Sequence, residues 1–397
     1  MWKEIGDREL RKLWTNLFSN RIRSARISSI QISNDKYIIS PHHGSIYSLQ
    51  VDLTEGQYLL SSASDASVAV YDVQHAAEYD ESGLIAKHKH IFLVDKQHEQ
   101  SHKYAISTAI WYPIDKGLFV TGSYDHYVNV WDTNTTQVVI NFKMPGKVYK
   151  TSMSPVATSH MLIAAGTEDV QVRLCDISLG AFAHALSGHR DGVMSVEWSA
   201  SSEWVLSSTL KSSSGGQNSS AKGHSPQKKM GNGVSIKHSV IARQVRGSGK
   251  QRLHPGMLLS QDRATAHYGA VSGLKVINDG MYLLSAGSDS RVRLWDIESG
   301  CNTLVNFETS RLQATKSIEL DIISHDSTLA FVPCMSTTKA SDLWSGKTMM
   351  DLRGHYENVN CCLYNSLDQE LYTCGNDRKI LVVDGQTFAI DQDNWSD

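Results

Sequence analysis

The chain has 397 residues, of which 41% are hydrophobic, and it is long enough for one large β domain or two or three smaller ones. Its formal net charge of -3 excludes no class of partner, but no apolar run approaches the roughly 18 residues of a membrane span, and the N-terminus MWKEIGDREL lacks a signal-peptide core. We therefore expect a soluble intracellular protein. The six cysteines contain no C-x-x-C pair, so we expect reduced thiols and no zinc site.

The N-terminal segment, 1–30, predicts an amphipathic helix. Its apolar stripe has the spacing i, i+3, i+4, i+7 and i+8, and consists of Leu10, Leu13, Trp14, Leu17 and Phe18. The opposite face is basic. Such a helix could pack on the rest of its own chain, enter a groove of another protein, or lie on a membrane surface. We favour the groove, because the repeats that follow form a closed structure without the helix.

Internal repeats follow. Four stretches have alternating strands, a tight turn and a second strand that ends at Asp72, Asp132, Asp296 or Asp384. Each contains a turn aspartate seven residues before that end, and a fifth stretch has the same spacing before Asp176. The five turn aspartates are Asp65, Asp125, Asp169, Asp289 and Asp377. A histidine precedes the turn aspartate by one and the same interval at His43, His267 and His355, and by an interval one position longer at His102.

This spacing resembles that of the WD-repeat family, in which the histidine, the turn aspartate, a strand Ser or Thr and the closing tryptophan form a buried hydrogen-bonded network. Trp131 and Trp295 stand at the closing position in two repeats. Buried polar groups need such mutual satisfaction. A catalytic His–Asp dyad is the alternative, but a catalytic pair would not need to recur in every repeat. We therefore expect structural roles for these residues and no catalytic residue.

The interval between the closing residues Asp132 and Asp176 gives the length of one repeat and allows the repeats to be counted. The interval from Asp296 to Asp384 is twice as long, so it holds one further, degenerate repeat. The fourth repeat begins at His189, but Lys211 and Asn218 stand where its two aspartates are due. Residues 207–266 take the place of its second half, with ten Lys/Arg and one acid, and predict a disordered insertion. The apolar residues between Val234 and Val245 could supply a substitute strand.

Seven repeats predict an all-β fold, a seven-bladed WD-repeat β-propeller with an N-terminal amphipathic helix and a disordered basic insertion in blade four. The expected divisions are a helical docking segment, blades 1–3 with the first half of blade 4, the insertion, blades 5–7 and an acidic C-terminal tail. Their boundaries are 1–30, 31–206, 207–266, 267–384 and 385–397.

Several stretches around the repeats resemble the Cockayne syndrome group A family of WD-repeat proteins. They include WYPIDKGLFVTGSYDHYVNVWDTNT, MSPVATSHMLIAAGTEDVQVRLCD, GHRDGVMSVEWS, RLWDIESGCNTLVNF, FVPC and LRGHYENVNCC. The resemblance implies a nuclear substrate receptor of a cullin-4 RING ubiquitin ligase that acts in transcription-coupled nucleotide excision repair. The implied partners are the ligase's damaged-DNA-binding adaptor subunit, the Cockayne syndrome group B ATPase and the stalled RNA polymerase II complex.

In that family an N-terminal helical segment docks on the adaptor, and large aromatic residues usually dominate such contacts, so we expect Trp14 and Phe18 to be the main anchors. Many receptors of this class also carry a Trp-Asp-x-Arg motif. Here Trp131 and Trp295 are followed at that position by Asn134 and Glu298, and the fourth repeat, where the family has the motif, lacks its ending. A scaffold of another nuclear complex, or a form impaired in docking, is the alternative function.

Two further features could form a metal site or a nucleic-acid site. His88, His90, His98 and His102 share one loop, but their spacing is irregular, and we expect ordinary loop residues and no metal. The insertion could contact nucleic acid through its charge, but it has no interleaved aromatics, which favours a flexible or targeting-related linker without direct nucleic-acid contact. No H-E-x-x-H or G-x-S-x-G set supports a propeller enzyme, and we expect no cofactor.

Overall fold

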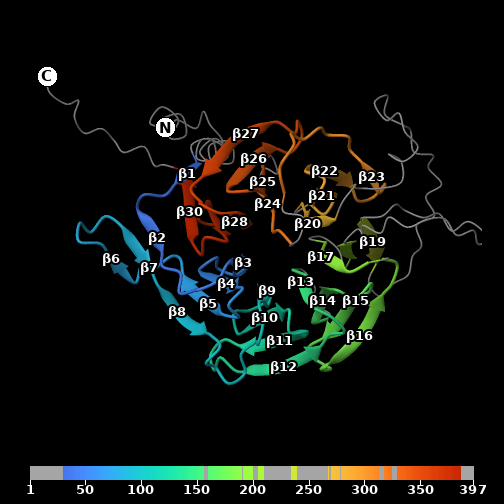
Figure 1. Ribbon diagram of the computed structural model, residues 1–397, viewed down its shortest axis with the longest axis horizontal. Helices are drawn as coiled ribbons and strands as arrows, with labels where there is room; N and C mark the ends of the chain where they lie inside the picture. The colour runs from blue at the N-terminus through green and yellow to red at the C-terminus, as the bar shows by residue number, and fades with distance from the viewer. Residues whose placement is uncertain are drawn as a thin grey trace, which may run out of the picture.

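The computed structural model describes residues 30–155, 160–189, 191–199, 204–209, 234–238, 267, 270–277, 279–312, 317–323 and 329–385. All regular elements in these ranges are β-strands, and they form seven sheets. The sheets follow one another around a ring in chain order (Figure 1). Within the same ranges no helix is long and apolar enough to cross a membrane.

Five of the sheets have four strands, which is the plan of a regular propeller blade. The first is β3 (Ile46–Val51), β4 (Tyr58–Ala63), β5 (Val68–Asp72) and β8 (His90–Val94); the second is β9 (Ile106–Trp111), β10 (Leu118–Ser123), β11 (Tyr127–Asp132) and β12 (Val138–Lys143). The third is β13 (Val148–Met153), β14 (Leu162–Thr167), β15 (Val172–Asp176) and β16 (Ala181–Leu186). The fifth is β20 (Val271–Val276), β21 (Tyr282–Gly287), β22 (Arg291–Asp296) and β23 (Cys301–Asn302); the sixth is β24 (Asp321–Ile322), β25 (Leu329–Cys334), β26 (Thr337–Asp342) and β27 (Thr348–Arg353).

The strands differ in burial according to their place in the sheet. The middle strands, such as β10 and β14, are almost wholly buried because neighbouring sheets cover both of their faces. The outer strands β12 and β27 mostly alternate half-buried and exposed residues, the period of two expected of a strand with one face in solvent. The alternating patterns that predict these strands from the sequence therefore have a direct physical cause.

The fourth sheet has three strands in the described part of the chain: β17 (Val193–Trp198), β18 (Trp204–Thr209) and β19 (Val234–His238). In the β17–β18 hairpin Trp198 lies opposite Val205, and β19 pairs antiparallel with β18. The substitute strand considered for residues 234–245 is thus present in shortened form. The predicted disorder of 207–266 is wrong at both strands, because the edge of β18 offers unpaired backbone groups that β19 satisfies.

The seventh sheet has seven strands and joins the two ends of the described chain. Three come from the last repeat: β28 (Val359–Asn365), β29 (Glu370–Gly375) and β30 (Ile380–Gly385). Four come from before and within the first repeat: β1 (Ile30–Ile32), β2 (Lys36–Ile38), β6 (Glu78–Tyr79) and β7 (Ala86–His88). Both β1 and β2 pair with β30, and β7 adds parallel to β2. The last repeat therefore obtains its fourth strand from residues that precede the first repeat.

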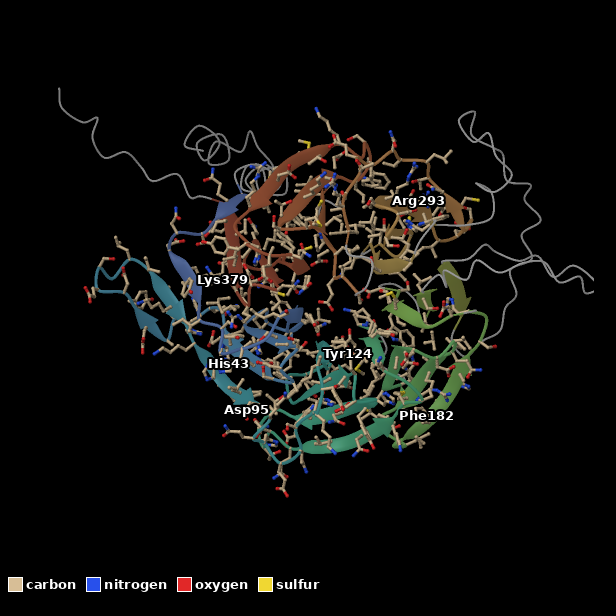
Figure 2. The ribbon with its side chains drawn as sticks, in the orientation of Figure 1. His43, Asp95, Tyr124, Phe182, Arg293 and Lys379 are labelled. Atoms are coloured by element: carbon tan, nitrogen blue, oxygen red, sulfur yellow. The ribbon has the colours of Figure 1, made fainter. Side chains whose placement is uncertain are left out.

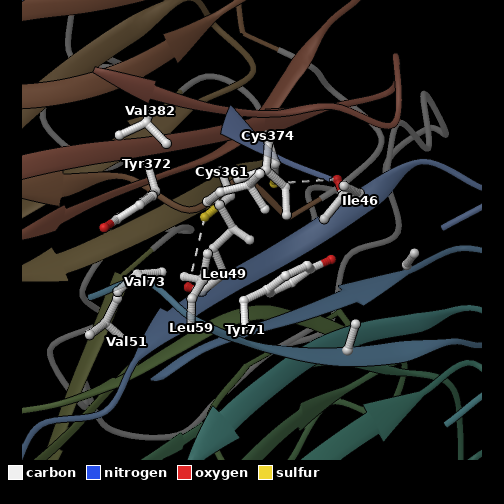
Figure 3. Close-up of a cluster of buried hydrophobic side chains, with 14 residues drawn as sticks. Ile46, Leu49, Val51, Leu59, Tyr71, Val73, Cys361, Tyr372, Cys374 and Val382 are labelled. Carbon is white, nitrogen blue, oxygen red and sulfur yellow. Dashed lines mark hydrogen bonds between the residues drawn. The ribbon is translucent and has the colours of Figure 1, made fainter. Parts of the chain in front are cut away.

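The hydrophobic core lies between neighbouring sheets. Figure 3 shows one such layer, in which Ile46, Leu59 and Tyr71 of the first sheet pack with Tyr372 and Cys374 of the seventh. Equivalent clusters join the first and second sheets and the second and third. Because each layer needs residues from two adjacent sheets, the ring buries its apolar surface only when it is closed.

The innermost strands carry the contacts around the ring. β3, β9, β13, β17 and β20 contact one another in sequence, and β28 contacts β3. The segment before β24 joins its neighbours through backbone hydrogen bonds: Ile318 N donates to Ser272 O and Glu319 N to Asn360 O, each at 3.0 Å, and Cys362 N donates to Glu319 O at 3.1 Å. Seven sheets thus follow one another around the ring. The predicted all-β propeller is confirmed, but the prediction of seven blades is wrong in that only five sheets of the described residues have the four strands of a regular blade. The fourth, predicted to be incomplete, has three strands, and the seventh has seven. The predicted N-terminal helix lies outside the described residues.

Candidate functional site

The second repeat contains the most complete buried hydrogen-bond network. His102 Nδ1 lies 2.8 Å from Asp125 Oδ2, and its Nε2 lies 2.8 Å from Thr121 Oγ1. Trp131 Nε1 donates to the same hydroxyl at 2.8 Å. Asp125 belongs to the turn between β10 and β11, and the hydroxyl and the indole stand on those two strands. The network therefore fixes the start of the repeat, its turn and two strands together.

The fifth repeat has the same arrangement, and the seventh has it without the tryptophan, because Val383 precedes its closing aspartate. His267 bonds Asp289 and Ser285, each at 2.8 Å, and Trp295 Nε1 donates to Ser285 at 2.8 Å. In the last repeat His355 lies 2.9 Å from Asp377 Oδ2 and 3.0 Å from Thr373 Oγ1. The structure thus brings together the residues that the sequence assigns to these networks, and the repetition of one arrangement around the ring fits a structural role.

In the first repeat the structure places His42 in the network, where the sequence predicts His43. The buried His42 ring bonds Ser67 Oγ at 2.5 Å and Ser61 Oγ at 2.6 Å. His43 is exposed, and only its backbone N–H reaches Asp65, at 2.7 Å. Two adjacent histidines fit the spacing rule almost equally well, and successive side chains of extended backbone point to opposite sides, so only one can be buried. The interval from the network histidine to its turn aspartate is thus the same in the first repeat as in the second.

The third and fourth repeats have only parts of the network. Asp169 pairs with Arg173 Nη2 at 3.2 Å, and no histidine stands at the corresponding position of that repeat. His189 Nε2 lies 2.6 Å from Ser207 Oγ, so the fourth repeat keeps its histidine and its strand hydroxyl. The position where its turn aspartate is due, 211, lies outside the described residues. The first half of the fourth repeat therefore keeps the histidine and the strand hydroxyl of a regular WD repeat.

Electrostatics inside the networks follow from burial and pairing. Burial alone would raise the pKa of Asp125, but the hydrogen bond and charge of His102 outweigh it, and the pKa lies below its usual value. Asp289 and Asp377 behave in the same way with their own histidines. Burial lowers the pKa of His42 to about 4, only partly opposed by the charge of Asp65. Each shift follows from burial and from the partners that the group has within its own network.

The loop histidines do not converge on a common point. His88 is buried, with its Nδ1 2.7 Å from Asp72 O, and the ring of His98 meets Trp131 edge-on at 5.9 Å. His102 belongs to the second network. Among the described residues no group of three or more His, Cys, Asp or Glu side chains is placed to hold a metal ion.

The centre of the ring contains a charged cavity that the sequence analysis misses. It has a volume of about 570 Å³ and is lined by the inner strands of several sheets. Its six charged residues are Asp52 directly after β3, Lys150 of β13, Glu197 of β17, Lys275 of β20, Glu319 just before β24, and Asp321 of β24. Lys150 pairs with Glu319, and Lys275 Nζ lies 3.0 Å from Asp321 Oδ1. The sequence does contain a sign of this cavity, namely a charged residue within an otherwise mostly buried inner strand. Glu197 and Lys275 each occupy the fifth position of such a strand.

Residues at the rim of the ring lie away from the central cavity. Figure 2 shows Tyr124 near the middle of the ring and Asp95 and Phe182 toward its rim. The residues predicted to contact a ligase adaptor, Leu10, Leu13, Trp14, Leu17 and Phe18, lie outside the described residues.

Comparison with known proteins agrees with this architecture. The WD domain, G-beta repeat family matches residues 95–132, 180–216, 260–296 and 346–384. The WD repeat-containing protein ATCSA-1 of Arabidopsis thaliana is 58% identical over 454 aligned positions, which cover 100% of each chain. Because those positions outnumber the 397 residues here, the plant protein has stretches without a counterpart in this chain.

More distant relatives match part of the chain. Radiation-sensitive protein 28 of Saccharomyces cerevisiae is 40% identical over 76 residues, 19% of this chain and 15% of its own length. Histone acetyltransferase type B subunit 2 of Candida glabrata is 25% identical over 166 residues, 41% of this chain and 36% of its own. On the full-length match and the repeat networks, the chain belongs to the WD-repeat proteins, in the group represented by ATCSA-1.

Proposed function

We propose that this protein is a non-enzymatic substrate-recognition subunit of a cullin-4 RING ubiquitin ligase, acting in the nucleus in transcription-coupled nucleotide excision repair. The resemblance to the Cockayne syndrome group A family and the full-length identity to ATCSA-1 support this assignment. A closed ring of sheets with buried structural networks is a rigid platform for protein partners. On this proposal the partners are the damaged-DNA-binding adaptor, the Cockayne syndrome group B ATPase and the stalled RNA polymerase II complex.

The observation that carries the docking part of the proposal is how the ring closes. β1 begins at Ile30, and β1 and β2 complete the pairing of β30. Ring closure therefore needs no residue before Ile30, and on this proposal the stripe predicted from Leu10 to Phe18 serves a partner. A helix with Trp14 and Phe18 on one face suits an apolar groove of the adaptor.

The fourth repeat supports a second candidate, a receptor form with weakened docking. Its sheet is completed by β19 from the insertion instead of by the second half of a WD repeat. The family's Trp-Asp-x-Arg motif belongs to that missing half. In this case adaptor binding depends more strongly on the N-terminal stripe than in a receptor with a complete fourth repeat.

The test is co-purification of the full chain with the purified adaptor. Trp14→Asp combined with Phe18→Asp should abolish recovery of the adaptor while the circular dichroism of the ring stays unchanged. The matched control is Leu84→Asp with Tyr356→Asp, two large apolar residues exposed on the ring. If the Trp14 and Phe18 double variant retains the adaptor as well as this control does, the docking assignment is wrong.

A chimera separates the two candidates. Replacing the segment from Ser207 to the residue before His267 with the fourth-repeat ending of ATCSA-1 should strengthen adaptor binding if the present chain is a weakened form. Equal binding by the chain and the chimera would show that the missing half contributes nothing to docking.

A further inference from the structure

The central cavity opens on the side of the ring where the inner strands end. Its lining includes Leu53 after β3, Pro113 after β9, Pro155 after β13 and Leu367 after β28. Leu53 and Leu367 are among the exposed large apolar residues of the described chain. The mouth of the cavity therefore has apolar contact surface at these leucines and prolines beside polar residues such as Asp52 and Ser366, whereas Lys150, Glu197 and Lys275 lie on the strands themselves. A volume of about 570 Å³ is within the usual range of ligand sites.

Five of the six charged residues in the cavity already have partners. Asp52 accepts from Tyr58 N at 2.6 Å and from Glu55 N at 2.9 Å. Glu319 accepts from Lys150 and, at 2.9 Å, from Ser48 Oγ of the first sheet. Asp321 is paired with Lys275 and accepts from Tyr364 N at 2.7 Å. The bonds of Glu319 and Asp321 cross the ring between sheets that are far apart in the sequence. They fix both lysines and both of these acids in place.

Glu197 differs from the other five. Its main chain pairs in β17, but its side chain lines the cavity, is only half-buried, and has no hydrogen bond or ion pair with any described residue. Burial raises the pKa of its carboxyl group, an effect that the charges of Lys275 and Lys150 oppose and those of Asp321 and Glu319 reinforce. A carboxylate drawn partly out of water without a counterion is costly, and an entering cation would relieve that cost.

We propose that this cavity binds an alkylammonium or guanidinium group carried on an aliphatic chain, with Glu197 as its counterion. The aliphatic part would lie against the apolar surface of the mouth at Leu53 and Leu367, and the charged tip would reach Glu197. Lysine and arginine side chains have this chemistry, since their stems cover apolar surface while the heads seek an acceptor.

The charge of the cavity favours a cation over an anion. Four acids, Asp52, Glu197, Glu319 and Asp321, line the cavity with two lysines, and both lysines are paired with acids of the cavity. An anion would have to break one of these buried pairs, which is expensive. A metal ion is disfavoured because the described residues provide no group of three ligands.

The test uses fluorine NMR of two matched probes with the full chain. Trifluoroacetyl-Leu-Arg-amide should bind, seen as broadening of its fluorine signal, and trifluoroacetyl-Leu-norleucine-amide should not. Glu197→Gln removes one charge at nearly constant volume and should weaken binding of the arginine probe about tenfold or more, as expected for a hydrogen bond to a charged group. Glu78→Gln, in the edge strand β6 and paired with Lys89, is the matched control and should leave binding unchanged.

A second variant, at a position other than Glu197, keeps the proposal testable if Glu197→Gln fails to fold. Leu367→Arg lies on the exposed rim and places a competing cation at the mouth, so it should also weaken binding of the arginine probe. Competition by spermidine distinguishes a free polyamine from a side chain of a partner: displacement at concentrations below those of the arginine probe assigns the site to the polyamine. Equal binding of both probes, or binding that Glu197→Gln and Leu367→Arg leave unchanged, would overturn the proposal.

Discussion

Ile30 and Gly385 lie opposite each other as paired residues of β1 and β30. Ile30 precedes the first repeat and Gly385 follows the closing aspartate of the last, so the ring is closed by pairing between the start and the end of the repeats. The neighbouring strand β2 extends this closure, with Ile38 opposite Ile380.

Replacing Ile38 by Ala should therefore weaken the whole ring. Ile38 is buried in the core layer between the first and seventh sheets, and its truncation should lower the free energy of unfolding by about 2–5 kcal/mol. Tyr37→Ala, one residue earlier and exposed, should have little effect. Urea titration of both variants checks this, and equal losses would mean that β2 is not part of the closing sheet.

The hydroxyl of Thr121 accepts from Trp131 Nε1 and is also hydrogen-bonded to His102 Nε2, so it serves two buried groups of the second network. Thr121→Val keeps the size of the side chain but leaves both groups unsatisfied, each at a cost of about 1–3 kcal/mol. Thr135→Val makes the same change at an exposed hydroxyl and should be close to neutral. Thermal unfolding followed by circular dichroism compares them. Similar midpoints for the two variants would contradict a stabilising role of the network.

Acid should destabilise the first repeat through His42. Its pKa in the folded protein is lowered to about 4 from 6.5, so between these values the unfolded chain binds a proton that the folded chain does not. Stability should fall as the pH drops through this window, by up to about 3 kcal/mol from this residue. His42→Gln should flatten the dependence of the unfolding midpoint between pH 7 and pH 4.5, whereas His43→Gln should not. An unchanged slope in His42→Gln would exclude His42 as the titrating group.

Two ion pairs of the same chemistry should differ in strength because they differ in burial. Lys150 and Glu319 meet in the cavity, with side chains 15% and 13% exposed, whereas Glu55, the partner of Lys116, is 62% exposed. Glu319→Gln leaves Lys150 without a full counterion and should cost about 2–4 kcal/mol, whereas Glu55→Gln should cost about 1 kcal/mol or less. Urea titration at low and high salt provides the measurement. A larger effect of salt on the Glu319 variant than on the Glu55 variant would contradict this assignment.

Local spacing explains why much of the fold could be predicted from the sequence. A turn aspartate and its histidine lie within one repeat at a nearly constant interval, so the networks around His102 and His267 follow from a pattern in a short stretch. The rule has a tolerance of one residue, which is why His42 and His43 could be told apart only in the structure, by burial.

Long-range pairings left no such pattern. β7 interrupts the first repeat to pair with β2 in the last sheet, and a strand as short as either of these has too few residues to show a period. The cavity charges come from the first repeat and from the third to the sixth, and Glu319 stands in the most degenerate one. Their convergence depends on ring closure, which no single repeat encodes.

The shared sheet of β1 and β30 also determines where tethered segments leave the molecule. Residues 1–29 are anchored at Ile30 in the seventh sheet, whereas the segment between β18 and β19 leaves from the fourth sheet, on the other side of the ring (Figure 1). A partner that binds both the N-terminal segment and the fourth sheet must contact the ring at two points on opposite sides. Such a partner fixes the orientation of the ring, whereas a partner that binds at one of the two points alone leaves the ring able to rotate about that contact.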